Sequence, residues 1–395
     1  MFYLLLLFYQ QKVRKLMKIE FYKHNVGLRE KMSVWKCLNS TFLTTGDYVY
    51  RFEKDLAKYL DVGYAIGVTS CTAALHLSLL GLDIGPGDEV ITTPMTFAAT
   101  ALAIIHTGAK PIFVDVERST GNLDLNLIGK GVTKRTKAIL PVHLYGQMCD
   151  MHRLNDLATK YKLSIIEDSA HALESKQLID TAFISPGMFS NTACFSFYTT
   201  KSITSGEGGA VVTNSKSLAE NLRLLRTHGL SKDASNRYNK FEHWDIVDFG
   251  WKYNMSNIQA SLLIPQLKRV EYYWKKRERL FGMYLYELYG TKGICLFDRQ
   301  VNSKHGCHLF TVLVPPDKRD LIIQRLHDKG INTTVNYRPL HLLKKFKEIY
   351  GYERGDYPNA ELIGDSTISL PLYPKLKDKE LLYVSNTLKQ IMRDL

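Results

Sequence analysis

The sequence predicts an α/β protein, with a large domain built on a central mixed, mostly parallel sheet and a smaller α+β domain at the carboxyl terminus. Three observations support this fold class. Short, nearly continuous apolar runs recur along the first two thirds of the chain, and strands buried on both faces have this character. Helical patterns separate several of these runs, and the pattern changes after Gln266.

Seven apolar runs are the predicted strands of the large sheet. They cover residues 64–70, 89–94, 110–116, 136–144, 163–168, 192–198 and 208–214. Helical periodicity predicts helices over Thr72 to Leu80, Met95 to Thr107 and Met151 to Tyr161. Alternation of strands and helices places a functional site at the carboxyl ends of the strands.

The domain boundary is expected near residue 268, giving domains of 17–267 and 268–395. A long charged helix is predicted from Leu267 to Tyr289, followed by a strand in HLFTVLVP and a helix from Arg319 to Lys329. Residues 1–16 begin with an apolar run too short to span a bilayer and then turn basic. We expect them to be a non-native or flexible extension, the alternative being a weak peripheral membrane contact.

Composition narrows the class of protein. The formal net charge of +13 at pH 7 favours an anionic partner, but the basic residues are spread and no nucleic-acid-binding module is recognisable. A phosphorylated substrate suits the charge equally well. The six cysteines are scattered without metal-ligand spacing, which predicts reduced thiols in the cytoplasm and no metal site.

Four features of the predicted large domain carry candidate chemistry. Ser70, Cys71 and Thr72 lie between a strand and a helix, where free N–H groups and a hydroxyl bind a phosphate or simply cap the helix. Asp168 ends a strand, where it faces a ligand or caps a turn, and Phe97 at a strand-to-helix transition is a stacking platform or a core residue.

The fourth feature is Lys201, in FSFYTTKSITSGEGGAVVTN. The glycines Gly206, Gly208 and Gly209 follow it, so the backbone must bend sharply or be approached closely. Pyridoxal phosphate (PLP) needs a lysine for its aldehyde, an acid for its pyridine nitrogen, an anion pocket and a flat partner. The ordered set of four features suits this cofactor, although none of them is specific alone.

The chain resembles the sugar aminotransferases of the DegT/DnrJ/EryC1/StrS family, which share the fold type I architecture of PLP-dependent transferases. The resemblance runs from about residue 42 to 371. The motifs that carry it are TTGDYVYRFEKDLAKYL, SCTAALHL, PMTFAATA, PVHLYGQMCDM, IIEDSAHAL, FSFYTTKSITSGEGGAVVTN, YNMSNIQASLLIPQLKRVE and NYRPLH.

The resemblance implies a role for each candidate residue. Lys201 would form the Schiff base and shuttle a proton, and Asp168 would pair with the pyridine nitrogen. His171 would lie near the ring hydroxyl, and Phe97 would stack on the ring. The phosphate would be held by Ser70, Cys71, Thr72 and Ser196, together with Asn254 from a neighbouring subunit of a homodimer.

The implied reaction transfers an amino group from L-glutamate to a nucleotide-linked keto sugar, with a 4-keto-6-deoxy hexose preferred, for glycan or lipopolysaccharide assembly. Candidate substrate residues from the small domain are Tyr337, Arg338 and His341. The sequence departs from the family over residues 174–191, which carry few glycines, and at Tyr198, where many members have histidine. These departures fall on positions expected to contact the substrate, and they leave the residues implied for the cofactor unchanged.

Three alternatives differ in class. A sugar dehydratase of the same fold would lack the lysine, and a non-catalytic regulatory protein would have lost Lys201 or Asp168, yet both residues are present. A nucleic-acid or membrane-surface binder rests only on net charge and the N-terminal apolar run.

Overall fold

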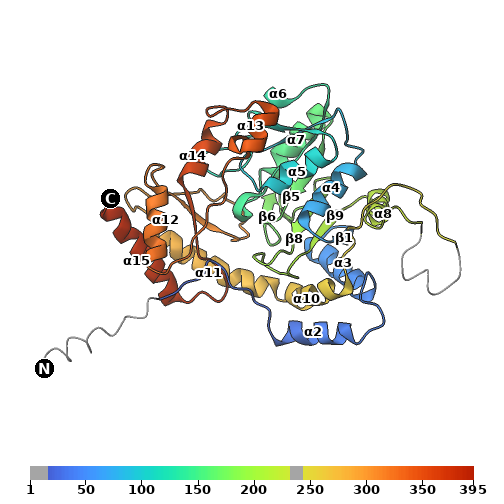
Figure 1. Cartoon of the computed structure of the whole chain (residues 1–395), viewed down its shortest axis with the longest axis horizontal. Coiled ribbons are helices and arrows are strands. Elements are labelled where there is room, and N and C mark those ends of the chain that lie inside the picture. The colour runs from blue at the N-terminus through green and yellow to red at the C-terminus, as the bar shows by residue number, and fades with distance from the viewer. Residues whose placement is uncertain (1–16, 232–242) are drawn as a thin grey trace.

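A computed structural model describes residues 17–231 and 243–395 (Figure 1), so the predicted extension 1–16 lies outside the described residues. Its centre is a seven-stranded sheet in the order β1-β9-β8-β5-β4-β2-β3. β9 is antiparallel to β1 and β8, and all other neighbours are parallel. The strands are β1 Tyr64–Val68, β2 Glu89–Thr92, β3 Lys110–Phe113, β4 Thr136–Ile139, β5 Ser164–Asp168, β8 Thr192–Ser196 and β9 Gly209–Thr213. All seven predicted strands and the mixed, mostly parallel sheet are confirmed.

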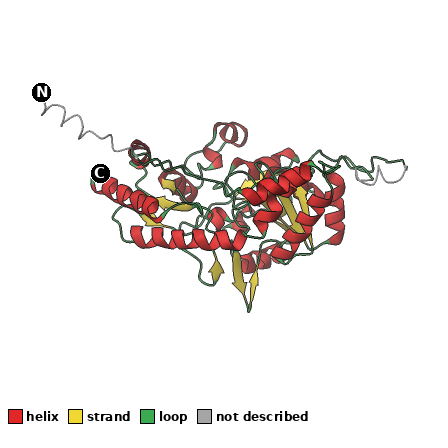
Figure 2. Cartoon of the chain, turned by 90° about the horizontal axis from the view of Figure 1, so that it is seen from below, coloured by secondary structure: helices red, strands yellow, loops and turns green. Residues whose placement is uncertain are grey.

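Helices cover both faces of this sheet, as Figure 2 shows. On one face α4 and α8 bury apolar side chains against the central strands, and on the other face α3 and α10 do so. α4 is buried almost all round and carries apolar residues on every side, as expected of a central helix. The helices are α3 Asp47–Leu60, α4 Cys71–Gly81, α5 Ala98–His106, α7 Met151–Tyr161, α8 Lys216–Leu225 and α10 Asn257–Leu267.

The carboxyl-terminal part has its own core around a three-stranded antiparallel sheet, β10-β12-β13. Helix α11 leads from the large sheet to this core, where α12 and α15 pack (Figure 1). These elements are α11 Val270–Leu288, β10 Cys295–Leu296, β12 Phe310–Leu313, α12 Arg319–Asp328, β13 Thr367–Leu370 and α15 Asp378–Arg393. The predicted boundary at 267/268 falls between α10 and α11 and stays a prediction.

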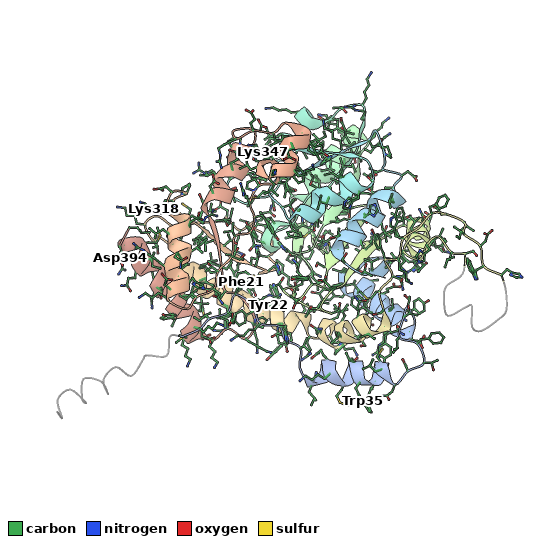
Figure 3. All side chains as sticks on the ribbon, in the orientation of Figure 1. Phe21, Tyr22, Trp35, Lys318, Lys347 and Asp394 are labelled. Atoms are coloured by element: carbon green, nitrogen blue, oxygen red, sulfur yellow. The ribbon has the colours of Figure 1, made fainter. Side chains whose placement is uncertain are left out.

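The start of the described chain packs with this carboxyl-terminal core. Ile19 is fully buried there and bridges Ile331. Phe21 and Tyr22, labelled in Figure 3, are half-buried against two neighbouring clusters. The following helix, α2 Leu28–Leu38, packs on α10 and leaves Trp35 59% exposed on its outer side (Figure 3).

A third sheet joins the two parts of the chain, and the sequence patterns do not predict it. The hairpin of β6 Lys176–Ile179 and β7 Ala182–Ile184 turns at Asp180 and pairs with β11 Ser303–Lys304. It occupies the stretch 174–191 in which the sequence departs from the resembled family. The remaining elements are α6 Ile128–Gly131, η1 Leu144–Gly146, η2 Leu340–Leu342, α13 Lys344–Tyr350 and α14 Pro358–Ser366. Within 17–231 and 243–395, no helix is long and apolar enough to cross a membrane.

Candidate active site

The candidate residues of the large sheet meet at the carboxyl ends of its parallel strands. Asp168 is the last residue of β5 and lies level with Cys194 of β8. Ser196 ends β8 and is paired with Gly209 at the start of β9. The loop between these two strands carries Lys201, so one sheet edge gathers Asp168 and Lys201, which are 33 positions apart in sequence.

Gly209 brings the lysine loop against the start of α4. A Cβ atom at this position would lie 2.4 Å from the Ser70 carbonyl carbon and 2.6 Å from the Cys71 nitrogen. Only glycine allows this approach of two backbones. Ser70 caps α4, and its hydroxyl accepts a hydrogen bond from the Ala73 N–H at 3.1 Å. The turn that caps α4 is also the turn predicted to bind an anion. Ser196 lies close to this turn because it is paired with Gly209, which contacts the Ser70 backbone.

The side chains around that turn are mostly covered. Cys71 is buried, and burial together with the nearby Asp168 raises the pKa of its thiol well above the usual value. Thr72 and Ser196 are half-buried, and the Ser196 hydroxyl accepts from the Tyr198 N–H at 3.3 Å. Such a turn, at the N-terminus of an 11-residue helix, suits a phosphate group.

Lys201 lies on a tightly hydrogen-bonded loop. Thr204 donates its hydroxyl to the Phe197 carbonyl at 3.1 Å and accepts from the Gly206 N–H at 2.9 Å. Gly206 has φ +82°, a conformation that side chains other than glycine rarely adopt. The lysine itself is half-buried, and burial lowers the pKa of its amine to about 8, against the opposing effects of Cys71 and Asp168. The amine is thus poised between charged and nucleophilic forms near neutral pH.

Asp168 is buried and held at both carboxylate oxygens. Thr100 donates to Oδ2 at 2.7 Å, and the Ala170 N–H donates to Oδ1 at 3.2 Å. Burial raises the pKa of Asp168, whereas the Thr100 hydrogen bond, the Ala170 N–H and the Lys201 charge act in the opposite direction. The carboxylate is therefore a fixed acceptor aimed from the end of β5.

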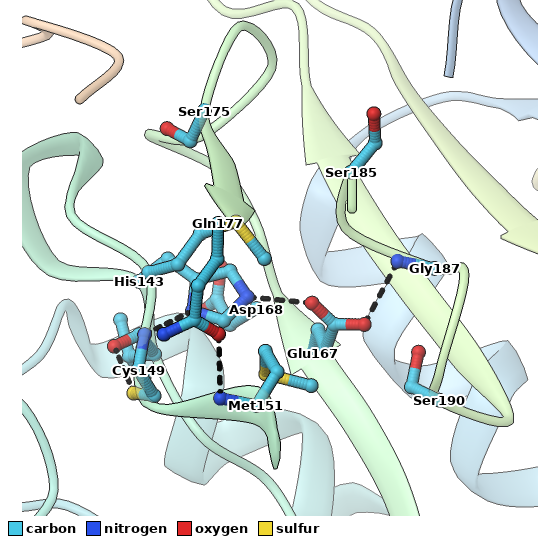
Figure 4. A network of polar contacts seen from close by, with 12 residues as sticks. His143, Cys149, Met151, Glu167, Asp168, Ser175, Gln177, Ser185, Gly187 and Ser190 are labelled. Atoms are coloured by element: carbon cyan, nitrogen blue, oxygen red, sulfur yellow. Dashed lines mark hydrogen bonds and ion pairs between the residues drawn. The ribbon is translucent and has the colours of Figure 1, made fainter. Parts of the chain in front are cut away.

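A buried polar network lies behind Asp168 (Figure 4). His143 contacts Glu167 at 2.6 Å, and the other Glu167 oxygen accepts from the Gly187 N–H at 2.8 Å. The second ring nitrogen of His143 accepts from the Cys149 N–H at 3.1 Å. Because side chains on successive strand residues point to opposite faces, Glu167 secures the strand while Asp168 faces the site. Gly187 belongs to this network and is the single glycine of residues 174–191, the stretch in which the sequence departs from the resembled family.

His171 lies beside Lys201 in a neutral form. Burial and the nearby lysine lower its pKa well below the usual value. Its Nδ1 accepts from the Tyr145 N–H at 3.2 Å, which assigns the ring proton to Nε2, 3.1 Å from the Tyr337 hydroxyl. His308 packs on the ring with centroids 4.4 Å apart. Tyr337 thus joins the large-sheet residues from the carboxyl-terminal part, and its role as a substrate residue stays a prediction.

Phe97 is the N-cap residue of α5 and is 62% exposed. Its ring centroid lies 6.1 Å from that of Tyr337, and the rings are tilted by 50°. The exposed ring of Phe97 lies beside Tyr337 and is accessible to a flat ligand. The alternative that Phe97 is a core residue is therefore excluded.

Asn254 lies near the same turn of its own chain. It bridges Val68, two residues before Ser70, and its amide donates to the Thr45 hydroxyl at 2.7 Å. Its role across a subunit interface stays a prediction.

Two predicted substrate residues are placed differently from Tyr337. Arg338 is exposed at the surface, and His341 is fully buried with its Nε2 2.9 Å from Glu361. A fully buried ring cannot contact a substrate, so the interpretation of His341 as a substrate residue is wrong for this structure. His341 is instead a core histidine whose Nε2 pairs with Glu361.

Three residues of the site escaped sequence reasoning: Thr100, Tyr145 and His308. The signal for Thr100 is that it is a polar residue in the otherwise apolar run of α5, spaced by one helical turn from Thr96 and Phe97. Tyr145 has φ +57°, and no sequence signal announces this conformation in a tyrosine. His308 reaches the site from the carboxyl-terminal part, and nothing local predicts that contact.

Comparison with known proteins decides the family. Residues 26–389 match the model of the DegT/DnrJ/EryC1/StrS aminotransferase family. The chain belongs to this family. The family, the fold class and the sugar aminotransferase activity predicted from the sequence are confirmed.

Similar proteins extend over nearly the whole chain. The spore coat polysaccharide biosynthesis protein SpsC of Bacillus subtilis is 38% identical over 377 residues, covering 93% of this chain and 95% of SpsC. An uncharacterized protein of Methanocaldococcus jannaschii is 41% identical over 375 residues, covering 93% and 96%.

Solved structures agree with this result. A Streptococcus pneumoniae protein assigned as a sugar aminotransferase, solved in a pyridoxamine phosphate (PMP) form, has a TM-score of 0.89 and 31% identity and covers 95% of this chain and 99% of its own. PseC of Helicobacter pylori, an aminotransferase in the biosynthesis of pseudoaminic acid, has a TM-score of 0.88 and 28% identity, covering 96% and 100%.

Proposed function

We propose that this protein transfers an amino group from L-glutamate to a nucleotide-linked keto sugar, with a 4-keto-6-deoxy hexose preferred, in glycan or lipopolysaccharide assembly. The observation that carries the proposal is Lys201, a half-buried amine with a pKa lowered to about 8 by burial. It lies where Asp168, His171 and the Ser70–Cys71 turn converge.

The residues present fit PLP, the cofactor of the Streptococcus pneumoniae neighbour, which has also been solved in a PLP form. The Gly209 approach builds the phosphate turn with Ser70, Cys71, Thr72 and Ser196. Phe97 offers an exposed ring for stacking, and Asp168 offers a carboxylate with a free lone pair on each oxygen. PLP, when bound, supplies a carbonyl for amine exchange and a ring that accepts electrons from the reacting carbon.

The chain's own groups then have separate tasks. Lys201 Nζ would take the proton from Cα of the amino donor and deliver it to the cofactor's C4′ carbon, as a general base and acid whose pKa lies near the working pH. Neutral His171 donates its Nε2–H to Tyr337, which leaves the Tyr337 O–H free to donate to a ligand. Buried Asp168 holds a positive ring nitrogen by charge and hydrogen bonding.

Polysaccharide assembly is supported by the name of SpsC, a spore coat polysaccharide biosynthesis protein. The negative charge of a nucleoside diphosphate is complementary to the protein's net charge of +13 and to the exposed Arg338 beside Tyr337. We also propose a cytoplasmic location and a homodimer with shared sites. All six cysteines are free in the structure, which supports a reducing compartment.

The two halves of the reaction can be tested separately. The PLP-loaded protein is mixed with L-glutamate alone, and 2-oxoglutarate is counted per protein chain; one equivalent is expected, and further turnover needs a keto sugar. L-Aspartate and D-glutamate serve as control donors that differ from L-glutamate in side-chain length and in configuration. A panel of TDP-, UDP- and GDP-linked keto sugars then identifies the acceptor. If no donor released its keto acid (2-oxoglutarate from glutamate, oxaloacetate from aspartate), the proposal would be overturned. Release of a keto acid that no nucleotide sugar can restart would overturn the acceptor alone.

A further inference from the structure

Thr100 is the fully buried hydroxyl that contacts the candidate ring-nitrogen partner, Asp168. It lies on α5, one turn after Phe97, and its Oγ1 is 2.7 Å from Asp168 Oδ2. A second threonine, Thr96, lies 2.8 Å from the Thr100 hydroxyl. The first turn of α5 thus presents both the exposed ring of Phe97 and a hydroxyl pair that ends at Asp168.

The direction of this chain follows from the number of protons. A threonine hydroxyl has one O–H, and an ionised carboxylate only accepts. Thr100 therefore donates to Asp168, and Thr96 donates to Thr100. The Ala170 N–H occupies Oδ1 at 3.2 Å, so each carboxylate oxygen receives one donor from within the chain.

The usual use of a helical threonine makes Thr100 distinctive. Such hydroxyls commonly donate to a backbone carbonyl of the preceding turn. Thr107, at the end of the same helix, does so: it is buried, and its Oγ1 donates to the Ile104 carbonyl at 2.8 Å. Thr100 instead contacts a side chain 68 positions further along the chain.

We infer that Thr100 is a positioning residue that keeps the Asp168 carboxylate ionised and fixes its orientation toward the cofactor's ring nitrogen. This inference rests on the proposed function, which pairs Asp168 with that nitrogen. The physical need for Thr100 is clear from burial, because a buried carboxyl favours its neutral form unless donors stabilise the charge. A neutral Asp168 would share a proton with the ring nitrogen and would no longer hold it positive.

The test compares PLP with an analogue that carries CH in place of the ring nitrogen. Dissociation constants of both compounds are measured by absorbance and fluorescence for the wild type, Thr100→Val, Thr100→Ser and Thr107→Val. The ratio of the two constants reports the contact with the ring nitrogen, and it is insensitive to losses that weaken both compounds equally.

The wild type is expected to bind PLP more tightly than the analogue, and Thr100→Val to reduce that preference about tenfold, which corresponds to one lost hydrogen bond to a charged group. Thr100→Ser keeps the hydroxyl and Thr107→Val lies outside the site, so both should keep the wild-type ratio. If Thr100→Val does not fold, Thr100→Ala removes the same hydroxyl with less crowding.

An unchanged ratio in the Thr100 variants, or equal loss for both compounds, would overturn the inference and leave the pairing of Asp168 intact. A wild type that does not discriminate between the compounds would overturn the pairing itself, and the inference with it.

Discussion

The two sides of the candidate site are built differently. On the side of the large sheet, Asp168, Ser196 and Lys201 follow directly from strand ends, and Gly209 locks them to the start of α4. On the side of the carboxyl-terminal part, Tyr337 reaches the site but Arg338 faces solvent and His341 turns into the core. Residues at strand ends are placed by the sheet, whereas residues on an irregular segment are each placed by their own contacts.

This difference predicts a rigid side for the cofactor and an adaptable side for the substrate.

A buried ion pair also connects the two sides. Glu174 accepts from Ser202, the neighbour of Lys201, at 3.0 Å, and from Arg277 of α11 at 2.5 Å. Arg277 also donates to the Cys307 carbonyl at 3.1 Å, next to His308.

The largest stability effect is expected at this ion pair. Arg277→Met leaves Glu174 charged and buried with only the Ser202 hydroxyl and no opposite charge beside it, which should cost about 3–5 kcal/mol in the free energy of unfolding. On the same helix, Arg279 pairs with Asp378 at the surface, where the side chains are 55% and 54% exposed, so Arg279→Met should cost at most about 1 kcal/mol. Urea denaturation of both variants checks the contrast. Similar losses in the two variants would show that the pair does not join the sides.

The two histidines offer the next contrast. His341→Gln disturbs a buried hydrogen bond to Glu361 and should lower the free energy of unfolding by about 1.5–3 kcal/mol while cofactor affinity is kept. His171→Gln should instead weaken PLP binding about tenfold, or ~1.4 kcal/mol. Thermal unfolding and PLP titration of both variants separate the effects. Loss of PLP affinity in His341→Gln would return that residue to the site.

Two glycines on the lysine loop give a smaller contrast. Gly209→Ala pushes a Cβ into the Ser70 backbone and should cost about 1–3 kcal/mol together with cofactor affinity. Gly206→Ala meets no atom within 4 Å and suffers only from its φ of +82°, at roughly 1–2 kcal/mol. PLP affinity measured on the folded variants should fall for Gly209→Ala alone. Equal affinities would mean that the Ser70–Cys71 turn does not hold the phosphate.

The smallest effect expected is a pH dependence of PLP capture, which is determined by Lys201 on the side of the large sheet. Burial lowers the pKa of Lys201 to about 8, and only the neutral amine attacks a carbonyl. The rate at which the cofactor-free protein captures PLP should therefore rise as pH increases through about 8 and level off above it. Stopped-flow absorbance follows this rate. A rate still rising at pH 10 would indicate a lysine with an ordinary pKa.

The contrast also explains which features the sequence predicts. The seven strands are short runs of apolar residues that are buried on both faces, and this pattern is visible without a structure. The positions of Asp168, Ser196 and Lys201 then follow from strand ends and glycines. The hairpin of β6 and β7 was missed because Lys176–Ile179 and Ala182–Ile184 are short and partly exposed.

Other features depend on contacts between distant residues. The burial of His341 is set by Glu361 on α14, and the position of His308 by Arg277 and His171. No local pattern reports such pairings, since VNYRPLHL has the same composition whether the histidine faces a ligand or the core.

Covalent attachment of the cofactor to Lys201 can be tested by chemical trapping. The PLP-loaded protein is reduced with borohydride, digested and analysed by mass spectrometry, with Lys201→Ala treated in parallel. One pyridoxyl group per chain is expected on the peptide that contains Lys201, and none is expected in the variant. A pyridoxyl group on another lysine, or equal labelling of both proteins, would contradict attachment at Lys201.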